Sequence, residues 1–351
     1  AFLPLIFVPM IIRSKAPLRL GLAGGGTDVS PYADLHGGSI LNATINMYAH
    51  TTIIPTDNGK IYLEAQDMEE FETLDSTEYL DPTGALALLK GVYNRVVKQF
   101  VKKPLSFEIY TRVDAPPGSG LGSSSTLVVS ILGAFAEWQN IPLGEYDIAH
   151  LAYEIERIDL GLAGGRQDQY AATFGGFNFM EFSKDDKVIV NPLRIKQRYA
   201  AELEHNLVLF YMGTSRESAK IIEKQTQNIN NSNTSAIEAT HNLKVQSVRM
   251  KEAILMGKTN AIGEVMHSGW ESKKKMAEGI SNPEIDKIYA TAMQNGATGG
   301  KISGAGGGGY FFFYCPNVSR TKLIKSLEPF GVRAQQYHFT REGLYTYIVT
   351  E

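Results

Sequence analysis

The sequence predicts an α+β protein with two domains, and three observations support that fold class. Patterns typical of strands and helices are mixed along the chain, without the strict alternation of a doubly wound parallel sheet. The second half differs from the first, because most of its patterns are helical. The chain also has 351 residues, which is enough for two domains. We place the domains at residues 10–195 and 196–351.

Up to residue 211, strand patterns alternate irregularly with helical ones. Apolar or alternating runs predict strands at residues 11–22, 40–55, 61–65, 105–113, 174–182, 187–190 and 206–211. Apolar spacing near 3.6 residues predicts helices at 85–100 and 148–158. Another helix is expected from the serines after Gly122 to Trp138, because Leu127, Ile131 and Phe135 share one face. A serine is expected to cap its start.

The rest of the chain is mainly helical in pattern. Helices are predicted at residues 215–227, 237–256, 260–269, 282–295 and 322–329, and strands at 310–314 and 344–350. A glycine-rich loop at 301–309 has a Gly-x-Gly-x-x-Gly spacing at Gly304, Gly306 and Gly309. A dinucleotide fold needs a helix after such a loop. A strand pattern follows here instead, so an NAD site is not indicated.

Composition excludes several classes of function. The net charge of −3 argues against a general nucleic-acid surface, which usually needs a basic excess. No stretch reaches the length of a transmembrane helix, so no membrane partner is expected. Cys315 is the only cysteine, which excludes an internal disulfide and favours a cytoplasmic setting. Residues 1–9, ahead of Met10, are expected to be an upstream extension or a remnant of cloning.

The most informative segment is the Gly/Ser loop at residues 116–126. Gly118, Gly120 and Gly122 let the backbone approach a ligand closely, and several N–H groups can then point into one concavity. A helix start behind such a loop adds positive charge, so the segment predicts a phosphate site. It lacks the Gly-Lys-Ser/Thr ending of a Walker A loop. Phosphate charge must therefore be met by N–H groups, the helix dipole and a metal.

Two other segments carry charged residues near glycines. Arg19 and Asp28 bracket three consecutive glycines, which imply a close backbone approach. A carboxylate at a helix end, Glu154 or Glu156, could meet Asp168 across a cleft. One would hold a metal and the other would take a proton. Each segment taken alone also fits a structural role, such as a turn cap, a surface ion pair or a solvated carboxylate.

Taken in order, these segments resemble those of the GHMP small-molecule kinases. Residues 116–126 look like the family's central phosphate loop, with Ser125 where an alanine is usual. Residues 161–169 resemble the GxxxGxxDQ segment of its sugar kinases, residues 301–309 its C-terminal glycine motif, and residues 19–28 its first motif. The resemblance implies a ribosomal S5-like N-terminal domain, a ferredoxin-like C-terminal domain and a site between them.

The resemblance also implies ATP and Mg²⁺ as cofactors and a role for each site residue. Asp168 would be the catalytic base, with Arg19 beside it. Ser124 and Glu156 would hold Mg²⁺, although which of the three serines faces the metal stays open. The residues expected to bind ATP are Pro117, Gly118, Ser119, Gly120, Leu121, Gly122, Ser123, Ser124 and Ser125. Those expected to bind substrate are Gly26, Thr27, Asp28, Thr214, Arg216, Gly306 and Gly307.

Within the family, residues 12–19, 24–32 and 36–45 resemble the branch that acts on D-glycero-D-manno-heptose 7-phosphate. This implies phosphorylation of the anomeric hydroxyl to a 1,7-bisphosphate, for GDP-heptose and surface-glycan synthesis. The partners would be ATP and a small sugar phosphate, in a possible homo-oligomer. The distal phosphate would need a cationic pocket, for which five candidates stay unranked: Arg13, Lys15, Arg216, Lys273 and Lys301. The alternatives are a kinase of another sugar, such as fucose, and a non-catalytic ATP/sugar sensor.

Overall fold

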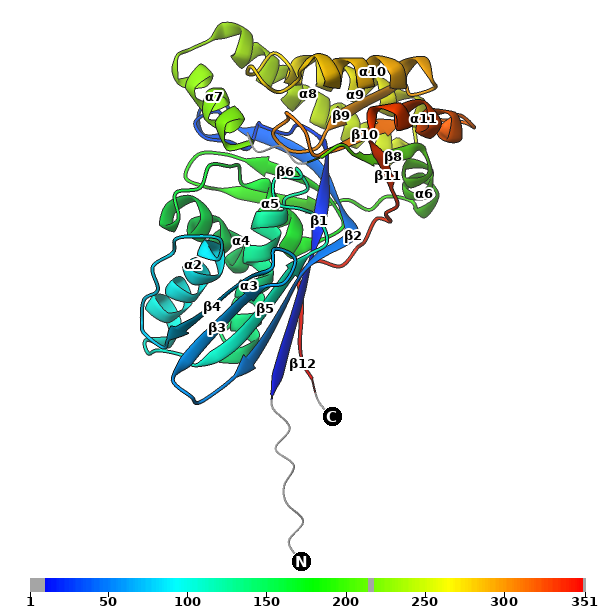
Figure 1. Cartoon of the computed structure of the whole chain (residues 1–351). Helices are drawn as coiled ribbons and strands as arrows, with labels where there is room; N and C mark the ends of the chain where they lie inside the picture. Colours follow the sequence, from blue (N-terminus) through cyan, green and yellow to red (C-terminus); the bar gives the residue numbers. More distant parts are fainter. Residues whose placement is uncertain (1–9, 214–217, 350–351) are drawn as a thin grey trace, which may run out of the picture.

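The computed structural model describes residues 10–213 and 218–349, and its two sheets mark two parts of the molecule (Figure 1). The large sheet has the order β12-β1-β2-β5-β3-β4, and β6 and β7 extend it from β2. Its pairs are antiparallel except β3 with β5. Its strands are β1 (Ile11–Ala23), β2 (Gly38–Pro55), β3 (Lys60–Ala65), β4 (Glu70–Asp75), β5 (Phe107–Val113), β6 (Phe177–Phe182), β7 (Val188–Pro192) and β12 (Tyr345–Val349).

The smaller sheet belongs to the second half of the chain. Its antiparallel order is β11-β8-β10-β9. The strands are β8 (Leu207–Tyr211), β9 (Gly299–Ile302), β10 (Tyr310–Tyr314) and β11 (Arg333–Gln335). The last strand, β12, returns to the large sheet and pairs with β1 from Ile11 opposite Val349 to Lys15 opposite Tyr345. The division at residues 195/196 stays a prediction, and β12 lies in the large sheet although it follows that division.

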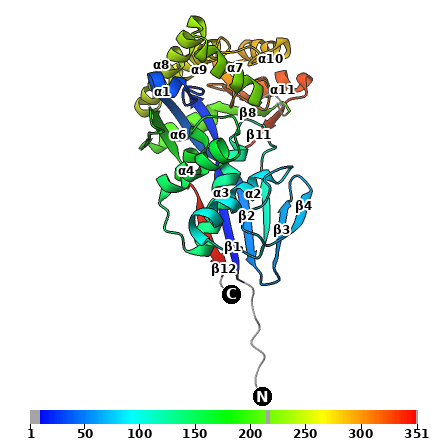
Figure 2. The same ribbon diagram turned by 90° about the vertical axis from the view of Figure 1, so that its left-hand side faces the viewer.

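Helices cover both sheets (Figures 1 and 2). In the first half they are α1 (Tyr32–His36), α2 (Ala87–Val96), α3 (Ser123–Gln139), α4 (Glu145–Glu154) and α5 (Gln167–Phe174). Short π-helical turns continue α2 (Val97–Val101) and α4 (Ile155–Asp159). The second half holds α6 (Gln197–Asn206), α7 (Ser218–Asn230), α8 (Thr234–Met256), α9 (Thr259–Lys273), α10 (Pro283–Gln294), α11 (Arg320–Leu327) and a 3₁₀ turn (Glu328–Phe330).

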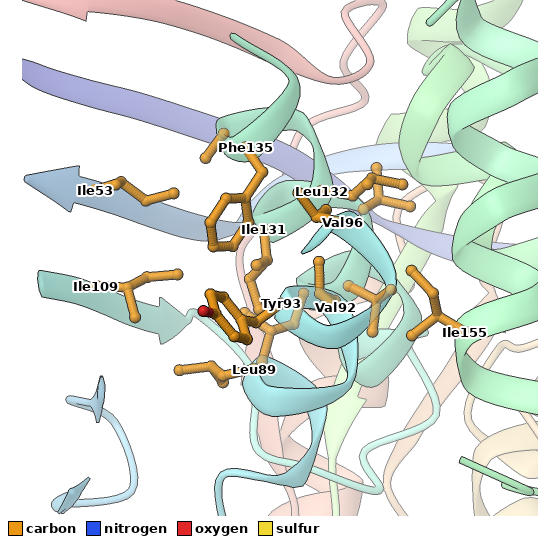
Figure 3. Close-up of a cluster of buried hydrophobic side chains, with 14 of the residues drawn as sticks. Ile53, Leu89, Val92, Tyr93, Val96, Ile109, Ile131, Leu132, Phe135 and Ile155 are labelled. Atoms are coloured by element: carbon orange, nitrogen blue, oxygen red, sulfur yellow. The ribbon is translucent and has the colours of Figure 1, made fainter. Parts of the chain in front are cut away.

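The core of the first part fixes where α3 begins. Figure 3 shows Ile53 and Ile109 from the large sheet facing Tyr93 of α2 and Phe135 of α3. Buried residues surround α3 on most sides, so the helix is central rather than amphipathic. Because the body of α3 is held by this packing, its N-terminus and the preceding glycine loop take a fixed position.

Two sequence predictions about local structure are wrong. The residue that caps α3 is Gly122, with φ of +77°, and no side chain caps the helix. That left-handed conformation favours glycine over serine. The predicted loop at residues 301–309 begins inside a strand, because β9 includes Lys301 and Ile302. The elements α1, β4, α5, α6 and β11 were not predicted. In the described residues, no helix is long and apolar enough to cross a membrane.

Candidate active site

A pocket of about 310 Å³ is lined by residues from both halves of the chain. Its first-half lining includes Arg19, Asp28, Glu156 and Asp168, together with the glycine loop before α3. Its second-half lining includes Lys273, Lys301, Gly304 and Ala305. Residues more than 280 positions apart therefore face one cavity.

The glycine loop supplies a concave, positive wall to this pocket. Gly118, Gly120 and Gly122 have φ values of +73°, +85° and +77°, and all three line the cavity. Ser123, Ser124 and Ser125 form the first turn of α3 and also line it. The first N–H groups of a helix have no acceptor within the helix, and they carry its positive end. This wall is suited to phosphate.

Leu121 and Ser119 support the loop from behind. Leu121 is fully buried in the apolar core, and the carbonyl of Ser119 accepts a hydrogen bond from the N–H of Tyr310 at 2.9 Å. The Ser119 hydroxyl is buried, with no hydrogen-bond partner among the described residues. Pro117, Ser119 and Leu121 are outside the pocket lining, so a direct contact of theirs with ATP stays a prediction.

Arg19 joins the catalytic candidate to the glycine loop. Its Nε and Nη2 lie 2.7 and 2.6 Å from Oδ1 of Asp168. Its Nη1 donates to the carbonyl of Gly120 at 2.6 Å and approaches the Ser303 hydroxyl at 3.3 Å. Only 3% of Arg19 is exposed, so the guanidinium is fixed in this position. The carboxylate of Asp168 is thereby held at the phosphate wall.

Glu156 and Ser124 meet at the same wall. The Ser124 hydroxyl donates to Oε1 of Glu156 at 3.1 Å, and Glu156 is only 1% exposed. Gln169 donates to both Glu156 Oε2 and the Ser125 hydroxyl, while the Ser123 hydroxyl lies 3.5 Å from the Pro116 carbonyl. Among the three serines, which the sequence could not tell apart, Ser124 is the one whose hydroxyl donates to the Glu156 carboxylate.

The oxygen donors of Ser124 and Glu156 fit Mg²⁺, which proteins bind through one or two carboxylates completed by phosphate oxygens and water. Within residues 10–213 and 218–349, no cluster of three or more His, Cys, Asp or Glu side chains is placed to hold a metal alone. Glu154, the other carboxylate considered from sequence, instead pairs with Arg95 at 2.7 Å.

Asp28 has a structural role that the sequence did not show. Its Oδ2 accepts hydrogen bonds from the N–H groups of Arg166 at 2.9 Å and Gln167 at 3.1 Å, at the start of α5. Burial, and secondly the charge of Asp168, raise the pKa of Asp28. A Cβ on Gly165 would lie 1.9 Å from Oδ2, so only glycine fits there. Asp28 therefore stabilises the helix that carries Asp168, from 138 residues earlier in the chain.

Of the other residues predicted to bind substrate, some line the cavity and others lie behind its wall. Gly26 lines the cavity, whereas Thr27 is fully buried and exchanges hydrogen bonds of 3.0 Å with the backbone of Ser39. In the second glycine loop, Gly304 lines the cavity. Gly306 and Gly307 lie outside the lining and pack against Ile280. Substrate contacts by Thr27, Gly306 and Gly307 stay predictions. Thr214 and Arg216 lie outside the described residues.

Two buried lysines line the cavity from the second half. Lys273 is 4% exposed and Lys301 is 8% exposed. Burial lowers the pKa of Lys273 to about 8 and that of Lys301 to about 7, and for Lys273 the charge of Asp28 partly offsets this. Arg13 and Lys15 line a separate hollow with Tyr345 and Tyr347. Of the candidates for the distal phosphate, Lys273 and Lys301 therefore line the pocket that holds Asp168, whereas Arg13 and Lys15 do not.

Comparisons with known proteins agree with this geometry. Residues 87–176 match the family described as GHMP kinases N terminal domain, and residues 250–328 match GHMP kinases C terminal. A D-glycero-alpha-D-manno-heptose 7-phosphate kinase from Campylobacter jejuni is 48% identical over 95% of this chain and 98% of its own.

Solved structures give the same result. The crystal structure of a D-glycero-D-manno-heptose 1-phosphate kinase from Bacteroides thetaiotaomicron is 42% identical, with a TM-score of 0.83 over 97% of this chain and 100% of that one. The Methanococcus jannaschii mevalonate kinase, at 21% identity and a TM-score of 0.74 over 95% of this chain and 99% of that one, shares the fold. The chain therefore belongs to the GHMP kinases, which transfer a phosphoryl group from ATP to an alcohol.

Proposed function

We propose that this chain phosphorylates the anomeric hydroxyl of D-glycero-D-manno-heptose 7-phosphate, giving the 1,7-bisphosphate for GDP-heptose and surface-glycan synthesis. The observation that carries the proposal is the Arg19–Asp168 pair, held at the glycine loop in a pocket built from both halves of the chain. The 48% identity to the Campylobacter jejuni heptose kinase over 95% of this chain supports the choice of sugar.

Binding and orientation of ATP are assigned to the first-half wall. The N–H groups of the loop at Gly118–Gly122 and the start of α3 bind the β- and γ-phosphates. Ser124 and Glu156 would hold Mg²⁺, which when bound offsets negative charge on the phosphate oxygens. Phosphoryl transfer depends mainly on positioning and on such charge compensation. The first-half wall provides both, because the core beneath α3 fixes its position and its N–H groups carry positive charge.

Asp168 is assigned the proton transfer. The acceptor hydroxyl oxygen bonds to the γ-phosphorus, the bond from that phosphorus to the bridging oxygen of ADP breaks, and the hydroxyl proton passes to a carboxylate oxygen of Asp168. Arg19 orients Asp168 through two contacts to Oδ1 and places positive charge next to the transferring group. Arg19 also contacts Gly120, so the base and the phosphate loop keep a constant separation.

Two other acceptors deserve direct comparison, because the names of the relatives differ. The Bacteroides thetaiotaomicron protein is called a heptose 1-phosphate kinase. A Bacteroides fragilis L-fucokinase/L-fucose-1-P guanylyltransferase is 24% identical to this chain, which spans only 34% of that longer protein. A non-catalytic sensor is disfavoured because Asp168, Glu156 and Ser124 are all present and meet at one wall.

The test is product analysis by ³¹P and ¹³C NMR after incubation with ATP and Mg²⁺. The acceptors are heptose 7-phosphate, heptose 1-phosphate and fucose, each supplied separately. The expected result is a new phosphorus signal coupled to C1 of heptose 7-phosphate, with ADP formed in equal amount. Turnover only with heptose 1-phosphate or only with fucose would replace the proposed substrate, and no turnover with any sugar would favour the sensor.

A further inference from the structure

We propose that Lys273 and Lys301 form the subsite that binds the distal phosphate of the acceptor, so that the pocket selects sugar phosphates over free sugars. This inference rests on the proposed function. Lys273 ends α9 and Lys301 lies in β9, and both side chains line the pocket. The two lysines come from segments 28 positions apart, and the fold of the second half brings them to the same cavity.

The two ammonium groups contact the end of β1 and the glycine turn that follows it. Nζ of Lys273 donates to the carbonyl of Gly25 at 3.2 Å, and Nζ of Lys301 donates to the carbonyl of Gly21 at 2.7 Å. A Cβ on Gly26 would lie 3.2 Å from Nζ of Lys273, and one on Gly25 would lie 3.7 Å from Nζ of Lys301. Because Gly25 and Gly26 carry no side chains, both ammonium groups pack closely against this turn, and both lysines line the cavity.

The charges that line the pocket are unevenly compensated. Arg19 pairs with Asp168, and Arg157 lies 3.7 Å from Glu156. Lys273 is attracted by the buried Asp28. Among the described residues, no carboxylate lies within salt-bridge distance of Lys301, whose charged neighbours are Lys273 and Arg19. Burial of an unpaired charge is unfavourable. A phosphate dianion between the two lysines would supply the missing negative charge.

Position separates this subsite from the nucleotide wall. The lysines hydrogen-bond to Gly21 and Gly25, whereas the proposed ATP wall is the loop at Gly118–Gly122 with the serines of α3. Arg19 and Asp168 contact that loop directly. Gly26 and Asp28, which the sequence assigns to the acceptor, line the pocket beside the lysines. The acceptor can then extend from Asp168 toward the lysine pair, with its two ends held by different groups.

The test compares Lys273→Met and Lys301→Met with the wild type. Methionine keeps most of the side-chain volume and removes the charge, and Lys275→Met, at an exposed position two residues beyond Lys273, is the matched control. The kcat/KM is measured for heptose 7-phosphate and for the same heptose without phosphate. Binding of a non-hydrolysable ATP analogue is measured separately, which also reports that each variant is folded.

The expected result is a loss of about 10- to 100-fold in kcat/KM for heptose 7-phosphate in each pocket variant, as for a lost hydrogen bond to a charged group. Affinity for the ATP analogue and activity on the unphosphorylated heptose should stay within about twofold of wild type, and Lys275→Met should match wild type throughout. An unchanged kcat/KM for heptose 7-phosphate would overturn the inference. So would an equal loss on both sugars together with weaker ATP binding, because the lysines would then serve the nucleotide.

A second measurement does not depend on the identity of the sugar. With the ATP analogue and Mg²⁺ saturating, inorganic phosphate should raise the Tm of the wild type and of Lys275→Met, but not of Lys273→Met or Lys301→Met. An equal rise in all four proteins, or none in the wild type, would contradict the subsite. If wild-type enzyme binds phosphate in this way but fails to phosphorylate heptose 7-phosphate, the proposed function fails and the phosphate subsite stands.

Discussion

The two walls of the pocket differ in how their charges are satisfied. On the first-half wall, Arg19 pairs with Asp168, and Ser124 donates to Glu156. On the second-half wall, Lys301 donates to the Gly21 carbonyl in β1 and Lys273 donates to the Gly25 carbonyl in the glycine turn after it. The first wall is preorganised by its own partners, as a group that acts in the transition state needs to be. In the described part of the chain, the second wall has positive charge that no carboxylate of the wall neutralises, which suits a site that binds an anionic ligand.

The walls also meet at the glycine loop. Gly120 of the first glycine loop lies against Ser303, whose hydroxyl donates to the Gly120 carbonyl at 2.8 Å. Arg19 donates to the same carbonyl. Substitutions within one wall should therefore affect the function of that wall alone, whereas substitutions at the contact should affect both walls.

The largest expected effect is on the first wall, at Asp168. Asp168→Asn should lower kcat by about 10²–10⁴-fold, the usual range for a general base, because the amide cannot take the hydroxyl proton. The rate is measured by coupled detection of ADP. ATP-analogue binding should be retained, and Asp57→Asn, at an exposed aspartate, is the matched control. Turnover of Asp168→Asn at the wild-type rate would remove Asp168 from this role.

The contact between the walls should give the next largest effect, which is on stability. Gly120→Ala places a Cβ 2.2 Å from the Ser303 carbonyl oxygen at a φ of +85°. Left-handed strain and overpacking together should lower the free energy of unfolding by about 2–5 kcal/mol. Gly59→Ala is the control, since its φ is +71° but nothing lies within 4 Å, so strain alone should cost about 1–2 kcal/mol. The free energies of unfolding are measured by urea denaturation. An equal loss in Gly120→Ala and Gly59→Ala would mean that the contact between Gly120 and Ser303 contributes nothing.

The lysine wall should respond to pH. With pKa values of about 7 for Lys301 and about 8 for Lys273 in the free protein, rising pH removes the charges that phosphate needs. The kcat/KM reports the ionisation of the free enzyme. For heptose 7-phosphate it should fall at least about tenfold from about pH 7 to about pH 9. The unphosphorylated heptose, or the Lys301→Met variant, should show a shallower fall, and parallel profiles for the two sugars would contradict the assignment.

The smallest expected effect separates neighbouring serines on the first wall. Ser124→Ala removes the hydroxyl that meets Glu156, and should raise the Mg²⁺ concentration for half-maximal rate by about three- to tenfold. Ser123→Ala is the matched control, because its hydroxyl lies at the Pro116 carbonyl and should leave the Mg²⁺ requirement unchanged. Titration of the rate with Mg²⁺ at saturating ATP distinguishes the two. A larger shift in Ser123→Ala would move the metal to another serine.

The same contrast explains what the sequence could predict. The Gly/Ser loop is contiguous, so its glycine spacing and the helix behind it point to phosphate without a structure. Arg19 and Asp168 are 149 residues apart, and their pairing was expected only through the resemblance to the GHMP kinases. Lys273 sits in a run of three lysines that looks like a solvated surface. Lys273 is buried because the second half of the chain packs against the first, and a local sequence pattern cannot predict such long-range packing.

The helix cap at Asp28 was missed for the same reason. The carboxylate and the N–H groups that it accepts from are 138 and 139 residues apart, so the sequence shows an aspartate near glycines and a separate short helix. The wrong serine cap of α3 has a local cause, because glycine at position 122 serves both the loop and the helix start.

The most direct test of the two-walled pocket is a crystal structure of Asp168→Asn with a non-hydrolysable ATP analogue, Mg²⁺ and heptose 7-phosphate. The expected electron density shows the triphosphate at Gly118–Gly122 and the serines of α3, the anomeric hydroxyl at position 168, and the 7-phosphate at Lys273 and Lys301. A triphosphate bound by the two lysines, or a sugar phosphate bound outside this cavity, would contradict the assignment of the walls.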